Sequence, residues 1–229
     1  AFKVANVSYF YDMPFAITNN AFEIYRNTFK QFGLGVKTGL DLPNESTGLQ
    51  GKKDTSGLLL DFSIGQYDNY TPLQLSQYIS TIANNGTRMK FYLLKEVYDK
   101  DSNLTNKIYE TKVEELNKVE TEQVFLDRVK EGFQAVLAYG GTGSGYIDKS
   151  YLPAGKTGTS QSFVDTNGDG LVDTETVSNT FVGYAPYDNP KVTFTVVSPD
   201  TYNYNTSYQS YVNKRITKRV SEKYFEIYG

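Results

Sequence analysis

The chain has 229 residues, of which 39% are hydrophobic and 21% are charged, with a formal net charge of −3. This composition is typical of a globular protein with one large domain or two small ones. It contains no histidine and no cysteine, which excludes Ser-His-Asp and Cys-His catalysis, disulfides, and zinc sites built from His or Cys. The absence of a basic run argues against nucleic acid as a partner. No apolar stretch approaches the roughly 20 residues that span a bilayer.

The first helical pattern begins at Asn20, which can cap a helix, and Glu23 completes a capping box. The apolar residues at helical spacing on its inner face are Phe22, Tyr25, Phe29 and Phe32. We expect Gly33 and Gly35 to end this helix.

A second helix is predicted to begin after Thr71. Thr71 can serve as the N-cap, Pro72 suits the first helical position, and Gln74 closes a capping box. The apolar residues that follow at helical spacing are Leu75, Tyr78, Ile79 and Ile82. Gly86 is expected to stop the helix, which has a broad apolar face and is therefore predicted to belong to the core. Glu45, Asp61 and Asp68 are expected to be surface or capping carboxylates.

Further along the chain, residues 91–98 and 107–113 read as strands joined by a turn at residues 99–103. Residues 120–139 are predicted to form a helix. Its inward residues are expected to be Phe125, Val129, Phe133, Val136 and Leu137. The glycine-rich residues 141–145 lack the lysine-hydroxyl ending and the following helix of a phosphate loop, so they predict a flexible linker.

The last part of the chain predicts two strands at residues 177–184 and 191–198 and a closing helix. The apolar residues of that helix are expected to be Tyr208, Val212, Ile216 and Val220, opposite a basic solvent face. Strands followed by a helix, with helices before them, predict an α/β fold of the α+β type in which helices cover an antiparallel sheet.

Residues 154–160, Ala-Gly-Lys-Thr-Gly-Thr-Ser, precede these two strands. Lys156 and the hydroxyls of Thr157 and Thr159 can hold a carboxylate, and the glycines let another backbone approach closely. The Gly-Lys-Thr-Gly sequence is too short to identify a carboxylate-binding site by itself. The alternative is a sheet turn with a solvated lysine.

Five ordered blocks together resemble the transpeptidase domain of penicillin-binding proteins, of the monofunctional class B type. The blocks are residues 32–35 with 38–45, residues 64–66 with 71–75, residues 83–86, residues 155–159, and residues 181–186. The resemblance implies the penicillin-binding and serine β-lactamase-like transpeptidase fold. It also implies an acyl-enzyme mechanism in which the serine of a Ser-x-x-Lys motif attacks the D-Ala-D-Ala end of a peptidoglycan stem peptide.

The same resemblance implies roles for individual residues. Lys156 would supply positive potential, and Thr157 and Thr159 would offer hydroxyls to the substrate's terminal carboxylate. Gly158 would avoid a clash with the bound substrate, and the backbone N–H of Thr159 would be one oxyanion-hole donor. The catalytic residues carried by this chain would then be Asn6, Lys156 and Thr159, and those binding substrate would be Lys156, Thr157, Gly158 and Thr159.

The chain departs from the family pattern at two motifs. No lysine has a serine three residues before it, and no Ser-x-Asn sequence is present. Ala5 and Asn6 match the last two positions of the Ser-x-Asn motif, preceded by Val4 instead of serine. We therefore expect residues 1–229 to be a partial transpeptidase domain that lacks its N-terminal part and the catalytic serine. Residues 1–90 would be its mainly helical part, and residues 91–229 would hold a helix, the sheet strands and the closing helix.

The implied partners are the stem peptide, β-lactams that mimic D-Ala-D-Ala, and other cell-wall synthesis proteins. The parent protein is expected to be anchored by an N-terminal segment on the extracellular face of the bacterial cytoplasmic membrane. A fragment without the serine is expected to be inactive alone. The alternatives are a non-catalytic penicillin-binding sensor and a structural cell-wall module on the same fold.

A separate loop resembles a calcium site. Its candidate ligands, at calcium-loop spacing, are Asp165, Asn167, Asp169, Leu171 and Asp173. Position twelve is Thr176 instead of glutamate, so any binding is expected to be weak. The alternative is a solvated hairpin loop in which Asp, Asn and Gly provide the turn geometry. The family chemistry requires no cofactor, so calcium would be structural.

Overall fold

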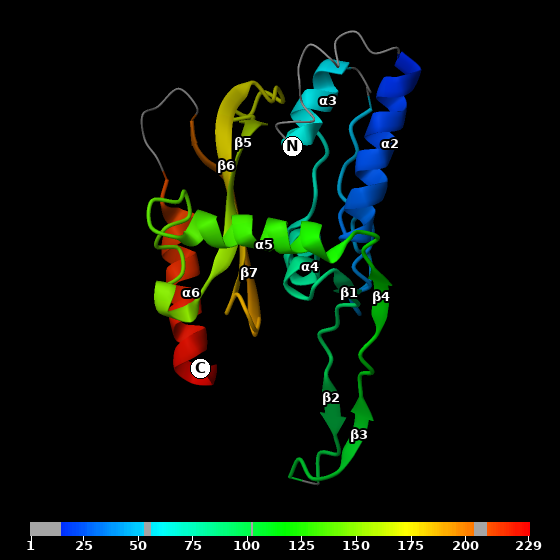
Figure 1. Ribbon diagram of the computed structural model, residues 1–229, viewed down its shortest axis with the longest axis vertical. Coiled ribbons are helices and arrows are strands. Elements are labelled where there is room, and N and C mark those ends of the chain that lie inside the picture. The colour runs from blue at the N-terminus through cyan, green and yellow to red at the C-terminus, as the bar shows by residue number, and fades with distance from the viewer. Residues whose placement is uncertain (1–14, 53–55, 102, 204–209) are drawn as a thin grey trace. The chain divides into compact units, whose positions relative to one another are not determined.

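The computed structural model describes residues 15–52, 56–101, 103–203 and 210–229, and the chain divides into two compact units, Ala1–Glu120 and Thr121–Gly229. The elements of the first unit are α2 (Phe15–Gln31), α3 (Ser56–Ser63), α4 (Pro72–Ala83), β1 (Thr87–Met89), β2 (Glu96–Tyr98), β3 (Lys107–Glu110) and β4 (Glu115–Lys118). Those of the second unit are α5 (Gln123–Leu137), the short 3₁₀-helix η1 (Lys149–Tyr151), β5 (Ala154–Val164), β6 (Thr174–Ala185), β7 (Val192–Asn203) and α6 (Val212–Tyr228) (Figure 1).

The predicted capping box of α4 is confirmed. The Thr71 hydroxyl accepts from the backbone N–H of Gln74 at 3.2 Å, and the Gln74 side-chain oxygen accepts from the Thr71 N–H at 3.0 Å. The expected start of the first helix is wrong, because α2 already begins at Phe15. A cap residue is a weak local preference that tertiary context overrides. The short helix α3 was not expected.

The core of the first unit is an aromatic cluster that surrounds a buried ion pair. Phe22, Leu59 and Phe62 are almost fully buried between α2 and α3. The Arg26 guanidinium contacts both Asp68 carboxylate oxygens, at 3.0 and 3.2 Å, and the rings of Phe22 and Phe62 lie 5.3 and 5.5 Å from it. Asp68 was predicted to be a surface or capping carboxylate. This prediction is wrong, because Asp68 is buried and pairs with Arg26.

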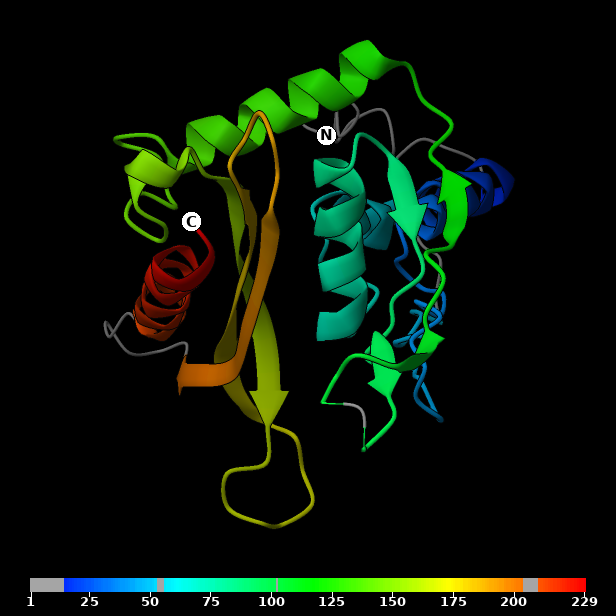
Figure 2. The same cartoon turned by 90° about the horizontal axis from the view of Figure 1, so that it is seen from below.

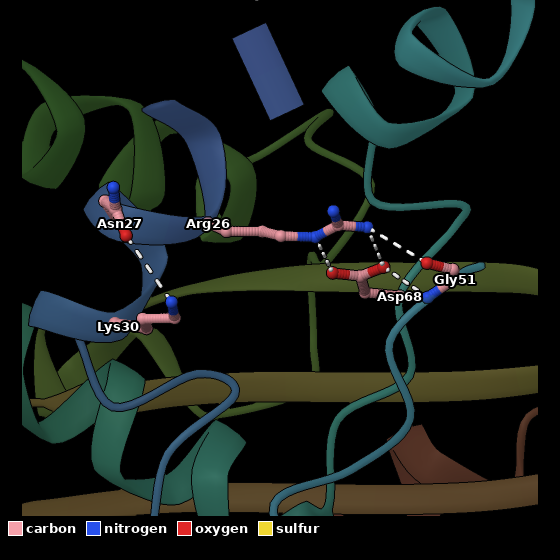
Figure 3. Close-up of polar contacts among 5 residues, drawn as sticks. All are labelled: Arg26, Asn27, Lys30, Gly51 and Asp68. Carbon is pink, nitrogen blue, oxygen red and sulfur yellow. Dashed lines mark hydrogen bonds and ion pairs between the residues drawn. The ribbon is translucent and has the colours of Figure 1, made fainter. Parts of the chain in front are cut away.

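The backbone of Gly51 extends this buried pair to a loop. Figure 3 shows the Arg26 side chain reaching from α2 to Asp68 and Gly51. The Gly51 N–H donates to Asp68 at 2.9 Å, and its carbonyl accepts from Arg26 at 3.4 Å. Because both charges are paired and hydrogen-bonded, the pair can remain buried and hold three segments distant in sequence.

Two short antiparallel ladders complete the first unit: β1 pairs with β4, and β2 pairs with β3. One chain segment carries β1 and then β2, and the returning segment carries β3 and then β4. The β2–β3 hairpin lies farther from the helices of this unit (Figure 1). The predicted strand at residues 91–98 is correct only from Glu96 onward. The Asp41 carboxylate accepts the N–H groups of Leu93 and Leu94 at 2.7 and 2.9 Å, which takes these donors away from a strand ladder. The predicted turn at residues 99–103 falls in the connection between β2 and β3, in which residue 102 lies outside the described residues.

The second unit is built on a three-stranded antiparallel sheet in the order β5-β6-β7. Helix α6 lies against one face of it, and the loop between β5 and β6 projects beyond one end (Figure 2). Leu137, Ile147, Phe181 and Phe194 form a buried cluster on the sheet. The antiparallel sheet predicted from the sequence is confirmed.

Strands β5 and β6 approach each other at a pair of glycines. Gly155 lies opposite Gly183, and Thr157 lies opposite Phe181. A Cβ atom built on Gly155 would lie 2.5 Å from the Val182 carbonyl oxygen and 3.1 Å from the Phe181 ring, and one on Gly183 would lie 2.7 Å from the same ring. The Phe181 ring thus occupies the space that two side chains would need, and the glycines are a packing requirement.

The predicted inner face of α5 is correct at the end of the helix, where Leu137 is buried in the cluster on the sheet and Val136 packs against it, and wrong nearer the start. In α5, Phe125 and Val129 are 59% and 42% exposed, while Leu126 and Lys130 are buried. The Lys130 ammonium lies 5.8 Å from the Tyr187 ring centroid, which partly accounts for a buried cation. Apolar periodicity identifies a stripe on a helix, but it does not identify the face that meets the sheet.

The buried residues of α6 are small and polar: Asn213, Thr217 and Ser221. The Asn213 amide donates to the carbonyl of Asn179 in β6 at 2.8 Å and to that of Val196 in β7 at 3.1 Å. The predicted inward residues Ile216 and Val220 are 41% and 52% exposed, and Tyr208 lies outside the described residues. Small side chains permit close approach, and the amide satisfies two strand carbonyls.

We predict that Asp68→Ala destabilises the protein by about 3–5 kcal/mol, because it leaves the buried Arg26 cation without its carboxylate. The matched control is Glu114→Ala, which removes the carboxylate of a 2.9 Å pair with Lys90 whose two side chains are 43% and 55% exposed. That variant should change stability little, because water screens an exposed pair. Urea unfolding followed by circular dichroism measures both, and equal losses would contradict the assignment of Asp68.

A second prediction concerns the glycine pair. Gly155→Ala should cost about 1–3 kcal/mol, because its methyl group must displace the β6 backbone. Gly158→Ala is the control in the same strand: its Cβ would lie 3.5 Å from the nearest atom, the Cβ of Thr180, which is an ordinary contact. The free energies of unfolding of the two variants are compared by urea unfolding. If Gly155→Ala were as stable as Gly158→Ala, the close packing at Gly155 would be wrong.

Candidate functional site

The residues predicted to bind substrate lie together in the first half of β5. Within the described residues β5 pairs only with β6 and forms one edge of the sheet. An edge strand presents unpaired backbone N–H and C=O groups that can accept an additional strand. The structure therefore places Lys156, Thr157, Gly158 and Thr159 where an extended peptide could pair beside them.

Side chains alternate between the two faces of the sheet along this segment. Lys156 and Gly158 lie on one face, where their partners on β6 are Val182 and Thr180. Thr157 and Thr159 lie on the other face. The Lys156 side chain is exposed, and its ammonium donates to the Thr157 carbonyl. Gly158 is also exposed and has no close neighbour that would exclude a side chain. Its lack of a side chain is therefore not explained by packing within the chain.

A hydroxyl from another loop contacts this segment. The Thr142 and Thr157 hydroxyl oxygens are 3.2 Å apart, within hydrogen-bond distance. The sequence did not indicate Thr142 as part of the site, because fifteen residues separate the two threonines and no spacing rule connects them. Residues 141–145 were predicted to be a flexible linker. They instead form a hydrogen-bonded loop.

Asn6, the remaining predicted catalytic residue, lies outside the described residues. The calcium-loop residues lie at the far end of β5, in the connection to β6. Nine residues separate Lys156 from Asp165 along an extended strand, which corresponds to about 30 Å. The two predicted sites are therefore separate.

Backbone N–H groups donate to two of the carboxylates of the connecting loop, Asp165 and Asp169. Asp165 accepts from the N–H groups of Gly168 and Gly170 at 2.7 and 2.8 Å, and Asp169 accepts from that of Leu171 at 2.8 Å. The N–H groups of Gly170 and Gly168 lower the pKa of the Asp165 carboxyl below its ordinary value. Because that pKa is depressed in the folded state, these bonds stabilise the fold above the ordinary aspartate pKa, and this contribution is lost as the pH falls through the depressed value.

The described part of the chain contains no group of three or more acidic, His or Cys side chains that could hold a metal ion. The turn interpretation of the loop accounts for its observed hydrogen bonds, and calcium binding stays a prediction. No helix among the described residues is long and apolar enough to cross a membrane.

Comparison with known proteins places the chain in a family. Residues 2–222 match the family described as "Penicillin binding protein transpeptidase domain". Penicillin-binding protein 2A of Bacillus subtilis (strain 168) is 47% identical over 214 residues, which cover 92% of this chain and 30% of that protein. The chain thus spans about a third of the length of the curated relatives that it matches.

Solved structures agree with this match. Penicillin-binding protein 2B from Streptococcus pneumoniae (strain R6) matches with a TM-score of 0.71 and 32% identity, over 89% of this chain and 32% of that chain. Penicillin-binding protein 3 from Mycobacterium tuberculosis, complexed with aztreonam, has the same fold, with a TM-score of 0.67 and 24% identity over 89% of this chain and 46% of that one. The fold class predicted from the sequence is confirmed, and the chain belongs to the penicillin-binding protein transpeptidase domain family.

Proposed function

We propose that this chain is the C-terminal part of a D,D-transpeptidase domain, in a protein that cross-links peptidoglycan stem peptides. The observation that carries the proposal is the Lys-Thr-Gly-Thr segment on a free edge of the sheet. There the segment leaves a cation exposed and a glycine without a packing role in the chain. Membership of the transpeptidase family supports the same reaction.

In this proposal the stem peptide pairs with β5 as an added strand. Lys156 and the Thr157 and Thr159 hydroxyls hold the terminal carboxylate of the substrate, and the absence of a side chain at Gly158 leaves room for the peptide. The Thr159 N–H stabilises the oxyanion that develops on the penultimate D-alanine carbonyl. Each of these groups binds or orients the substrate, and none of them is a nucleophile.

The nucleophile is a serine outside this chain. Its oxygen forms an ester with the penultimate D-alanine carbonyl carbon as the bond to the terminal D-alanine breaks. A lysine one helical turn after the serine takes the serine proton and returns it to the leaving amine. Asn6, which matches the last position of the Ser-x-Asn motif, supports this transfer through hydrogen bonds of its amide and does not itself carry the proton. The acceptor amine of a second stem peptide then attacks the ester carbonyl carbon and forms the new amide bond as the bond to the serine oxygen breaks, and the lysine passes the proton of the amine to that oxygen.

The partners follow from this chemistry. β-Lactams carry a carboxylate beside a strained amide and acylate the same serine. The parent protein works with other cell-wall synthesis proteins on the extracellular face of the bacterial cytoplasmic membrane, held there by an N-terminal anchor. This chain alone is inactive because it lacks the nucleophile.

In the full-length parent protein, Lys156→Ala should slow acylation by penicillin about tenfold to a hundredfold. It removes a charge-assisted contact to the carboxylate, which contributes about 1.5–3 kcal/mol. Lys149→Ala, which removes an exposed lysine from η1 in the same unit, should leave the rate unchanged. The second-order rate constant of acylation is measured by intact mass.

The same measurement tests the whole proposal. The unmodified parent should gain the mass of one penicillin on a serine, whereas this chain alone should gain none. A parent that is never acylated would contradict the transpeptidase function, and an adduct on the isolated chain would contradict the placement of the serine. An unchanged rate in a folded Lys156→Ala variant would remove Lys156 from the site.

For the loop between β5 and β6 we propose weak, structural calcium binding. Millimolar calcium should then raise the melting temperature of the protein, because a ligand that binds only the folded state stabilises it. Asp169→Ala should abolish the rise. A calorimetric titration that shows no heat of binding up to millimolar calcium would contradict calcium binding and would leave only the turn interpretation.

A further inference from the structure

The loop between α5 and η1, residues 138–148, is fixed to the end of α5. The Gly143 N–H donates to the Val136 carbonyl at 3.0 Å, and that of Gly141 donates to the Ala138 carbonyl at 3.0 Å. A Cβ atom on Gly141 would lie 2.2 Å from the Val136 carbonyl oxygen, and one on Gly143 would lie 2.3 Å from the Leu137 side chain. The two glycines on either side of Thr142 therefore allow the loop to pack directly on the helix.

Two further contacts hold the other end of this loop. The Tyr146 ring stacks on Phe181 with a centroid distance of 4.7 Å, and Ile147 is only 2% exposed. The Lys214 ammonium, from α6, donates to the Ser144 carbonyl at 2.8 Å. The loop is thus attached to α5, to β6 and to α6, and its backbone has little freedom around Thr142.

This anchored loop presents one hydroxyl to the candidate site. Thr142 is exposed, and its hydroxyl lies 3.2 Å from that of Thr157. Each threonine hydroxyl has a single proton to donate. A carboxylate can only accept, so when Thr157 donates to a bound carboxylate its oxygen is left to accept from Thr142. The chain of hydrogen bonds then runs in one direction, from Thr142 to Thr157 to the ligand, and each bond strengthens the next.

We propose that Thr142 is a positioning residue for carboxylate recognition, which orients the Thr157 hydroxyl toward the carboxylate of the substrate. The proposal rests on the proposed function and deepens it. Thr142 does not touch the substrate. Without its hydroxyl, Thr157 can point its proton elsewhere, and the bound carboxylate loses a preoriented donor.

The decisive variant is Thr142→Val in the full-length parent, because valine has nearly the shape of threonine and lacks the hydroxyl. Thr142→Ser keeps the hydroxyl. Thr166→Val is the matched control: the Thr166 and Thr174 hydroxyls also form a pair, 2.9 Å apart, at the far end of the β5–β6 hairpin. All three substitutions affect exposed side chains of the same unit.

Acylation is measured with benzylpenicillin and, at higher concentration, with its methyl ester, which has no free carboxylate. Thr142→Val should lower the second-order rate constant for benzylpenicillin about threefold to tenfold and leave that for the ester unchanged. Thr142→Ser should retain the rate, and Thr166→Val should behave as the unmodified protein. In a Thr157→Val background, Thr142→Val should have no further effect.

A Thr142→Val rate for benzylpenicillin equal to that of the unmodified protein would overturn the inference. Equal losses for the acid and the ester would also overturn it, because a purely structural role of the loop would slow both. These results would leave the proposed function intact, since the unmodified parent is still acylated. A parent that is not acylated by either compound would overturn the proposed function and this inference with it.

Discussion

The close approach of β5 and β6 at Gly155 and Gly183 is the constraint on which the candidate site depends. The Phe181 ring fills the space that side chains at these positions would need, so the two strands and the buried cluster on the sheet pack as one body. The same ring stacks on Tyr146 in the loop that precedes β5. One aromatic residue on the central strand therefore packs against both β5 and the loop that contacts it.

The first unit is organised by a different force. Arg26 and Asp68 are charged groups in an apolar environment, and they are tolerated because each satisfies the other and the backbone of Gly51 (Figure 3). Hydrophobic packing is non-directional, whereas a bidentate pair accepts few geometries. The aromatic cluster contributes the buried apolar surface of this unit. The ion pair determines that the loop with Gly51 lies against α2.

Local signals in the sequence predicted local structure well. The α4 capping box was predicted because Thr71 and Gln74 are three residues apart, and it is confirmed. The carboxylate-binding role of the Lys156 segment was inferred from adjacent residue types, and it stays a prediction. The buried faces of α6 and of the first part of α5 were not predicted, since what a helix buries depends on a partner that is remote in sequence. Lys130 is buried beside Tyr187 and Asn213 beneath two strands, and neither position could be read from apolar periodicity. The contact of Thr142 with Thr157 was missed for the same reason.

The uninterrupted pairing of β5 with β6, from Ala154 opposite Tyr184 to Val164 opposite Thr174, determines where the length of this protein can change. Deleting one residue between Thr157 and Val164 while the hairpin end stays paired would exchange the faces of Lys156 and Thr157. Residues added within the loop 165–173 lie outside the ladder and leave both faces as they are. The hairpin tip is therefore the place in this unit to insert a label or an epitope without exchanging the two faces of β5.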